Sequence, residues 1–303
     1  MKSRHEFRHA RLQPVSFFTR QPVRTIPILS KNHQHIRYRA IARYGWSPDL
    51  PDQRDYVYAA PLRRLGRLPA RTDLRAQCPA VYDQGLIGAC TANAIAAAIE
   101  FDLIKQKAAD FIPSRLFIYY NERAMEHTVP LDNGAQLRDG IKSVNQLGVC
   151  PESQWPYVPT PANPGTNLWP IGAKPAQKPP STCYREALNH QVVSYQRVDR
   201  DLVQMKGCLA AGYPFVFGFT VYESFESATV KRTGVLNLPS VSEGVVGGHA
   251  VLAVGYDDAA KRFIVRNSWG AKWGQQGYFT IPYKYLLTAS LARDFWTIRM
   301  VEG

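Results

Sequence analysis

The sequence predicts an α+β protein with helices in the first half of its main domain and strands in the second. Three helix-forming segments lie within residues 90–147, and several strand-forming segments lie within residues 192–301. Between them, residues 156–180 contain eight prolines. Because that density leaves no room for a regular helix or a central strand, we expect a long irregular connection that divides the domain into two lobes.

Residues 1–67 are interpreted as a basic N-terminal extension and linker. Residues 1–43 hold ten Lys or Arg and one acidic residue, a net charge of +9 out of +13 for the chain. This arm is either a solvated tail or a binding site for an anionic ligand such as nucleic acid, a nucleotide or a membrane surface. Residues 45–55 contain proline and are expected to run extended, and residues 56–58 to form a short strand or anchor.

Membrane insertion and metal binding are not expected. No apolar run reaches 18 residues, and no apolar segment of signal-peptide length follows the basic N-terminus, so we expect a cytoplasmic protein or export by another route. The five cysteines are widely spaced without a Cys-x-x-Cys pair, so neither a zinc site nor another cofactor is predicted. Their number is odd, so at least one is free, and one disulfide remains possible among Cys78, Cys90, Cys150, Cys183 and Cys208.

Three helices are predicted first. The segment from Cys90 to about Lys107 is apolar on most of its faces, so we expect it to be central and buried. Pro113–Arg123 follows, with proline near the first turn. Leu137–Leu147 has an apolar residue every three or four positions, and Gly148 is expected to end it.

Strands are predicted after the proline-rich connection, because apolar and β-branched residues dominate short segments bounded by turn residues. A short helix is expected at Asp201–Ala211. The predicted strands are Val192–Val198, Pro214–Val221, Gly248–Tyr256, Arg262–Arg266, Gly277–Ile281 and Phe295–Val301.

The loop from Gln84 to Cys90 is the first candidate for chemistry. Gly85 and Gly88 give it a permissive backbone, and it delivers Cys90 to the first turn of a helix. The helix dipole there favours the thiolate, which is the nucleophilic form of cysteine. The alternative interpretation is a buried core cysteine, which is the more common fate of a single cysteine.

A cysteine nucleophile needs a base, and the base needs a group that orients it. His249 begins a long apolar strand directly after Gly247 and Gly248, two glycines that clear space beside it. Asn267 ends a strand, and its amide can accept the imidazole N–H. Trp269 could shield that hydrogen bond from water.

These three segments resemble the papain family of cysteine peptidases, most closely its bacterial members. The matching segments are Gln84 to Cys90, Gly248-His-Ala-Val-Leu-Ala-Val-Gly-Tyr256 and Asn267-Ser-Trp-Gly. The resemblance covers residues 68–301 and implies a two-lobed fold, with the active-site cleft between a helical lobe and an antiparallel barrel-like lobe. It predicts a peptidase domain at 68–303, divided into a helical lobe at about 68–155, the connection at 156–182 and a β lobe at about 183–303.

The resemblance also implies the roles of the site residues. Cys90 would attack the scissile carbonyl and form a thioester, and His249 would protonate the leaving amine. Asn267 would orient His249, and Gln84 would donate to the developing oxyanion together with the Cys90 backbone N–H. Trp269 would flank the leaving-group side.

Substrate contacts follow from the same resemblance. Gly134 and Ala135 would bind the peptide backbone, with Ala135 standing where the family has a second glycine. The pocket for the second residue before the cut would include Leu137, Gly218, Gly247 and Ala250, and Gly248 is a further expected substrate contact. Its glycines favour a roomy apolar pocket, although they could instead serve tight turns.

Two departures from the family and one regulatory feature complete the interpretation. Ile87 replaces a disulfide cysteine, and Thr91 replaces a tryptophan, so how the loop is held is an open question. We expect a monomeric endopeptidase acting on peptides or proteins, with peptide ligation as the alternative reaction. Part of residues 1–65 is expected to lie across the cleft as an intramolecular inhibitory segment, as in a zymogen.

Overall fold

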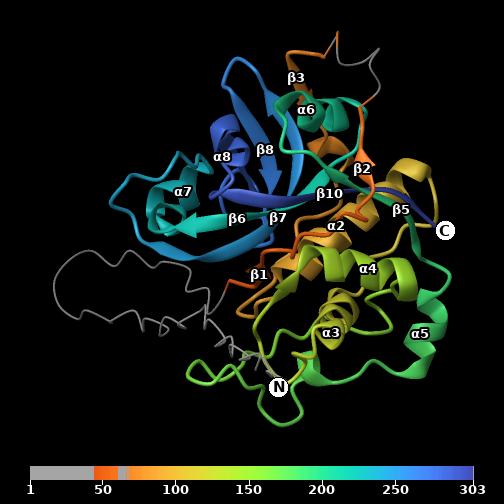
Figure 1. The fold of residues 1–303 in the computed structure, drawn as a ribbon. Coiled ribbons are helices and arrows are strands. Elements are labelled where there is room, and N and C mark those ends of the chain that lie inside the picture. The colour runs from red at the N-terminus through yellow and green to blue at the C-terminus, as the bar shows by residue number, and fades with distance from the viewer. Residues whose placement is uncertain (1–43, 61–65, 67, 303) are drawn as a thin grey trace, which may run out of the picture. The chain divides into compact units, whose positions relative to one another are not determined.

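The strand-rich second half of the chain forms an eight-stranded sheet (Figure 1). The computed structural model describes residues 44–60, 66 and 68–302. In spatial order the strands are β2 (Val57–Tyr58), β5 (Val192–Val198), β10 (Ala292–Val301), β6 (Phe215–Tyr222), β7 (Val245–Asp257), β8 (Arg262–Arg266) and β9 (Tyr278–Pro282), while β3 (Arg71–Asp73) pairs with β7. All six predicted strands are therefore confirmed, with ends shifted by up to three residues.

The sheet is open rather than closed into a barrel. Its order ends at β2 on one side and at β9 on the other, and these two strands do not pair in the described part of the chain. The edge strand β2 is only two residues long and comes from the N-terminal extension, so it offers little backbone for closure. The expected barrel-like lobe is thus corrected to an open, mainly antiparallel sheet within the predicted α+β fold.

The three predicted helices are confirmed as α2 (Cys90–Gln106), α3 (Arg115–Met125) and α4 (Leu137–Leu147). Helix α3 begins two residues later than expected because Ser114 caps it: its hydroxyl accepts the Phe117 N–H at 3.2 Å. Gly148 ends α4 with a φ of 69°, a conformation that favours glycine.

Helix α2 lies between the sheet and the helices α3 and α4 (Figure 1), and it contacts β7, β10, α3 and α4. Fourteen of its residues, Cys90–Leu103, are buried, as the apolar composition of all its faces predicts. The hydrophobic core is one connected cluster that spans the helices and the sheet. Consequently the N-terminus of α2 is brought next to β7, where His249 lies.

The remaining helices are short. They are α5 (Ser181–Ala187), α6 (Leu202–Ala210), α7 (Ala228–Thr233) and α8 (Tyr283–Leu287), with 3₁₀ turns η1 (Arg75–Gln77), η2 (Lys174–Ala176) and η3 (Glu223–Glu226). Only α6 was expected, because helices of five to seven residues are too short to show a 3.6-residue period. Helix α5 begins inside the predicted connection, and residues 156–180 are otherwise irregular apart from η2. None of the described helices is both long and apolar enough to span a membrane.

The N-terminal extension joins the fold at two places. Strand β1 (Trp46–Ser47) pairs in parallel with β4 (Ala135–Gln136), and β2 pairs in parallel with β5. The strand expected at residues 56–58 is therefore present as β2. The basic arm, residues 1–43, lies outside the described residues.

Candidate active site

Cys90 is the first residue of α2, and its side chain is fully buried. The preceding loop ends at Ala89, the N-cap residue, whose side chain makes no cap hydrogen bond. The backbone N–H of Ala250, on β7, lies 3.4 Å from the Cys90 Sγ. The sulfur therefore lies beside β7, one residue along from His249, with the unpaired N–H groups of the first helical turn close to it.

His249 and Asn267 are hydrogen-bonded to each other. The His249 Nε2 lies 2.8 Å from the Asn267 Oδ1, and both side chains are buried. The same Oδ1 accepts the Ser268 backbone N–H at 2.8 Å, which fixes the orientation of the amide. Three elements distant in sequence, α2, β7 and the end of β8, thus bring the three predicted residues together.

Aromatic side chains enclose the histidine and asparagine pair. The Trp269 ring lies 5.0 Å from the His249 ring at an interplanar angle of 31°. Phe225 packs 5.1 Å from Trp269 and 5.4 Å from Trp273. Because these rings exclude water, they strengthen the hydrogen bond between His249 and Asn267.

Gln84 is held so that its amide nitrogen is available as a donor. Its Oε1 accepts the Ser268 hydroxyl at 2.6 Å, which settles the orientation of the amide. Its Nε2 donates to the Ile87 carbonyl at 3.0 Å, and a second hydrogen remains on that nitrogen. The backbone N–H of Gln84 donates to the Ser268 carbonyl at 2.8 Å, so the loop is tied directly to the asparagine segment.

Buried polar groups hold the nucleophile loop in place of a disulfide. The Gly88 N–H donates to the Asp132 carboxylate at 3.0 and 3.2 Å, and the Tyr119 hydroxyl donates to the same group at 2.5 Å. The Thr91 hydroxyl donates to Glu122 at 2.6 Å. Sequence reasoning missed Asp132 and Glu122, because each is an isolated acidic residue outside any motif.

Burial in this arrangement favours the neutral thiol of Cys90 over the thiolate. Burial raises the pKa of Cys90 to about 12, while the backbone N–H groups of Ala250, Gly45 and Thr91 oppose the rise. One of these three groups, Gly45, belongs to the N-terminal extension. Residues of the extension therefore influence the pKa of the thiol, and with it the fraction of reactive thiolate.

Residues Tyr44–Ser47, which we call the covering segment, lie over the predicted substrate-binding residues. The Ala135 N–H donates to the Gly45 carbonyl at 2.8 Å, and Trp46 is the pairing partner of Ala135. Gly45 approaches the nucleophile loop so closely that a Cβ on it would lie 1.6 Å from the Gly88 oxygen. Ala135, the departure from the family pattern, still uses its backbone for pairing.

The predicted pocket glycines face this segment. A Cβ on Gly218 would lie 1.9 Å from the Trp46 ring, and one on Gly248 would lie 2.6 Å from it. Gly247 instead faces Tyr44, where a Cβ would lie 2.7 Å from its side chain. Gly134, with a φ of 71°, lies against the Gly45 carbonyl. Leu137 and Ala250 are fully buried.

Tyr44 covers the histidine side of the site. Its ring lies 5.8 Å from the His249 ring, and its hydroxyl donates to the Glu226 carboxylate at 2.7 Å. Within the described ranges, no group of three or more His, Cys, Asp or Glu could hold a metal ion. The five cysteines are free, and four of them are buried.

Comparisons with known proteins point to one family. The family model described as papain family cysteine protease matches residues 68–289. An uncharacterized peptidase C1-like protein of Acanthamoeba polyphaga mimivirus is 46% identical over 249 residues, which is 79% of this chain and 74% of that protein. A cathepsin B-like protein of Giardia intestinalis is 30% identical over 219 residues, 67% of this chain and 64% of that protein.

A solved structure is also similar over most of the chain. The crystal structure of xylellain, a cysteine protease from Xylella fastidiosa, superposes with a TM-score of 0.82 at 48% sequence identity. The match covers 88% of this chain and 99% of that one. The resemblance inferred from three sequence segments is therefore confirmed over a much larger part of the chain.

Proposed function

Because the chain belongs to the papain family of cysteine proteases, we propose that it hydrolyses peptide bonds through Cys90, His249 and Asn267, and that the covering segment holds it latent. Two observations together support it: the Cys90 Sγ lies 3.4 Å from the backbone N–H of Ala250, the residue next to His249, and the His249 Nε2 lies 2.8 Å from the Asn267 Oδ1. Membership of the family makes the protein a peptide hydrolase, so its substrates are peptides or proteins.

The reaction runs through a thioester. The Cys90 sulfur attacks the scissile carbonyl carbon and forms a C–S bond, while His249 holds the thiol proton as an imidazolium. The C–N bond then breaks, and the imidazolium gives its proton to the leaving amine. A water molecule, deprotonated by His249, then attacks the thioester carbon. The C–S bond breaks, the carboxylic acid product departs, and the proton on His249 returns to the Cys90 sulfur. Asn267 keeps the imidazole plane fixed through both steps.

Gln84 and the Cys90 backbone N–H are the proposed donors to the oxyanion. The Gln84 Nε2 carries a second hydrogen besides the one donated to Ile87, and the Cys90 N–H, in the first turn of α2, has no acceptor within the helix. One such donor contributes about 3–4 kcal/mol to the transition state in other acyl-transfer enzymes. Ser268 supports this role because its hydroxyl holds the amide the right way round.

Latency is supported by the path of the covering segment. Gly45 reaches the thiol, and the next residue, Trp46, lies at Ala135 and the pocket glycines. In a bound substrate, the residue that fills the pocket comes before the scissile bond in the chain. The substrate would therefore run from the pocket toward Cys90 in the N-to-C direction. The covering segment runs in the opposite direction, so it occupies the binding groups without offering its own peptide bond in a substrate's orientation.

Replacing the nucleophile tests the catalytic proposal. Cys90→Ala is expected to abolish hydrolysis of a fluorogenic peptide library and labelling by a thiol-directed epoxide. Cys78→Ala is the matched control, because Cys78 lies outside the site, where its sulfur contacts the Leu74 carbonyl and the Tyr278 side chain. Undiminished hydrolysis by Cys90→Ala would sink the proposal.

A glycine substitution tests latency without altering the peptidase domain. In Gly45→Ala the added Cβ would collide with the Gly88 oxygen, so the covering segment should be expelled. Peptide hydrolysis and epoxide labelling should both rise. Gly66→Ala is the control, since a Cβ there meets nothing within 4 Å. Equal rates in the two variants would show that the segment does not restrain the enzyme.

A further inference from the structure

The extension beyond the covering segment is fastened to the domain by buried charges. We call Asp49–Ala60 the anchor. The Asp49 N–H donates to the Asp294 carboxylate at 2.8 Å. The Asp49 carboxylate, whose side chain is fully buried, accepts the Arg138 backbone N–H at 3.0 Å and the Trp296 indole N–H at 2.9 Å. These bonds tie one residue of the extension to both α4 and β10.

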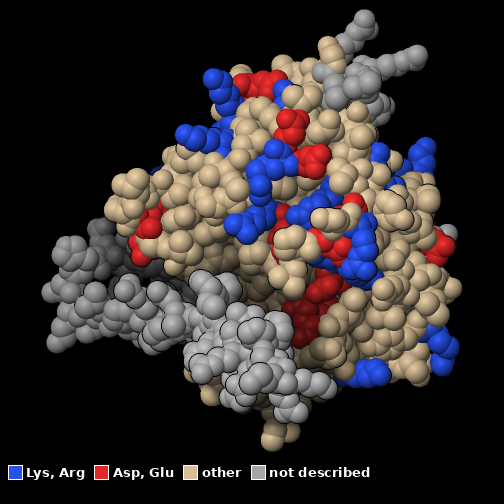
Figure 2. All heavy atoms as spheres, in the orientation of Figure 1, with Lys and Arg blue, Asp and Glu red and all other residues tan. Residues whose placement is uncertain are grey.

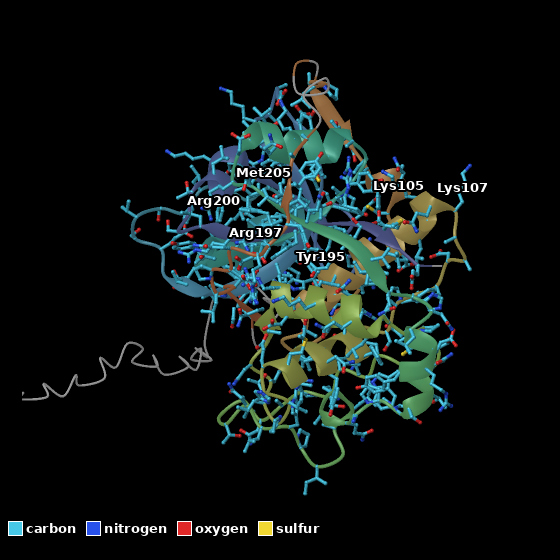
Figure 3. The ribbon with its side chains drawn as sticks, turned by 45° about the vertical axis from the view of Figure 1, so that its right-hand side comes forward. Lys105, Lys107, Tyr195, Arg197, Arg200 and Met205 are labelled. Atoms are coloured by element: carbon cyan, nitrogen blue, oxygen red, sulfur yellow. The ribbon has the colours of Figure 1, made fainter. Side chains whose placement is uncertain are left out.

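A second acidic residue of the anchor makes a buried ion pair. Asp55 accepts the Arg138 guanidinium at 2.6 and 3.1 Å and the Arg197 guanidinium at 3.2 Å. The Arg138 and Asp55 side chains are only 6% and 9% exposed. Arg197 lies on β5 beside Tyr195 (Figure 3) and also contacts Asp294 at 3.2 Å. Figure 2 shows acidic and basic side chains gathered next to one another on this side of the molecule.

The end of the anchor belongs to the central sheet. Val57 and Tyr58 pair with Arg197 and Val198 of β5, and Tyr58 is 4% exposed. The Ala60 N–H donates to the Gln204 side chain of α6 at 2.8 Å. Removing the anchor would therefore withdraw the buried Tyr58 side chain from the core and leave several buried polar groups of the domain without partners, each of which costs stability.

The covering segment is attached in a different way. Its contacts include a two-residue strand pairing with Ala135 and Gln136, the Gly45 N–H at the Cys90 thiol, and the side chain of Tyr44, which bonds Glu226 and lies against the ring of His249. Its other contacts press aromatic rings against glycine backbone that a substrate would also need. Ser47, the last residue of the covering segment, and Pro48, which separates it from the anchor, are both exposed. A peptide substrate can thus compete for the Ala135 backbone, the pocket glycines and the thiol, which hold most of the covering segment, but for none of the groups that hold the anchor.

We propose that the anchor is a permanent part of the active enzyme and that the covering segment is a tethered inhibitor displaced about Ser47 and Pro48. The inference rests on the proposed latency and specifies its regulation. Cutting the chain after the anchor would leave the inhibitor in place. Because the tether keeps the segment at an effective concentration of the order of millimolar, substrate must outcompete it rather than wait for its loss.

Displacement has a kinetic signature. A segment that only competes for the site lowers the fraction of open enzyme at low substrate concentration and is fully displaced at saturation. Gly45→Ala should therefore lower KM by about tenfold or more, with kcat unchanged within about twofold. A segment that instead has to be removed irreversibly would leave kcat low until a cut occurs.

The experiment uses the full chain with a recognition sequence for a site-specific endoprotease inserted after Gly66, where the surroundings are open. After cutting, residues 1–66 are held by non-covalent contacts alone. We expect this fragment to co-elute with the peptidase domain on native size exclusion, and KM to stay within about twofold of the uncut protein. In an Asp55→Ala background the cut fragment should dissociate, and KM should fall to the Gly45→Ala value.

The outcomes separate the two proposals. The anchor proposal is refuted if the cut wild-type fragment dissociates and KM falls. It is also refuted if the cut fragment of Asp55→Ala co-elutes with the domain as the wild-type fragment does. If Asp55→Ala does not fold, Asp55→Asn takes its place, because it keeps the size of the side chain but removes the charge from the ion pair. Failure of Gly45→Ala to change KM in the uncut chain refutes latency, whereas co-elution tests the anchor by itself.

Discussion

Cys90 and His249 are positioned by supports of different chemistry. On the helical side, buried carboxylates accept hydrogen bonds from the nucleophile loop and from the start of α2, through Asp132 and Glu122. On the sheet side, the rings of Trp269, Trp273 and Phe225 pack around the His249–Asn267 pair. One reactive group is therefore held by directed polar bonds and the other by packed aromatic area.

The difference determines how each side tolerates change. A hydrogen bond depends on the position of single atoms, and a buried group that loses its partner is costly. Aromatic packing depends on volume and tolerates replacements that keep it. The loop can dispense with the disulfide usual in the family because its carboxylate contacts supply the directional restraint that a covalent bond otherwise gives.

Removing the largest ring on the sheet side should have the largest effect. Trp269→Ala is expected to lower the free energy of unfolding by about 3–5 kcal/mol, because it leaves a cavity beside His249. It should also lower kcat, since water then reaches the His249–Asn267 bond. Urea unfolding and peptide hydrolysis measure the two effects. Trp269→Phe, which retains much of the ring, should recover most of both, and a Phe variant as impaired as Ala would contradict the packing argument.

The polar side is tested at Asp132. Asp132→Ala should lower the free energy of unfolding by about 3 kcal/mol, because the Gly88 N–H and the Tyr119 hydroxyl lose a buried acceptor. Asp132→Asn keeps one acceptor oxygen and should be milder. Asp199→Ala, at an exposed position, is the control for removing a carboxylate. If Ala and Asn behave alike in urea titrations, the hydrogen bonds are not what holds the loop.

A buried carboxylate without such partners sharpens the contrast. Asp102, on α2, has no hydrogen bond to either oxygen among the described residues, and burial raises its pKa to about 7, against opposing charges on Lys105 and Arg299. The folded pKa lies above the unfolded one, so its stability contribution is present below about pH 4 and is lost as pH rises through 7.

Asp102→Asn should therefore stabilise the protein by about 2 kcal/mol at pH 8 and by much less at pH 4. Denaturation at the two pH values measures the difference. An equal effect at both would mean that the charge of Asp102 is compensated in the folded protein. Asp132→Asn should destabilise under the same conditions, which separates paired from unpaired buried carboxylates.

The smallest effect concerns the thiol. Burial raises the pKa of Cys90 to about 12, above the pKa of the thiol in the unfolded chain. The neutral thiol therefore contributes stability to the fold at pH values below the unfolded pKa, and this contribution is lost as pH rises through 12. Expelling the covering segment in Gly45→Ala removes burial, the largest cause of the raised pKa, together with the smaller opposing contact from the Gly45 N–H, so the pKa should fall on balance. Iodoacetamide labelling at pH 7 should become about tenfold faster, which is about 1.4 kcal/mol. A pH–rate profile that is the same for Gly45→Ala and Gly66→Ala would contradict this origin.

Much of the site could be predicted because its signals are local. A glycine loop before an alanine-rich helix indicated Cys90, and strand patterns next to glycines indicated His249 and Asn267. The short helices α5, α7 and α8 could not be predicted, since fewer than two turns show no periodicity. Asp132 and Glu122 could not be found either, because an isolated acidic residue gives no sign of whether it will be buried against a loop.

The sequence by itself determined the order of the elements, the three segments of the site and the family they indicate, because hydrophobic period, glycine placement and motif spacing are written along the chain. Only the tertiary structure decided how the N-terminal extension divides into the covering segment and the anchor. The bonds from Asp49 to Asp294 and Trp296 join residues 245 and 247 positions apart. Such pairings depend on which surfaces meet after folding, and no local pattern encodes them.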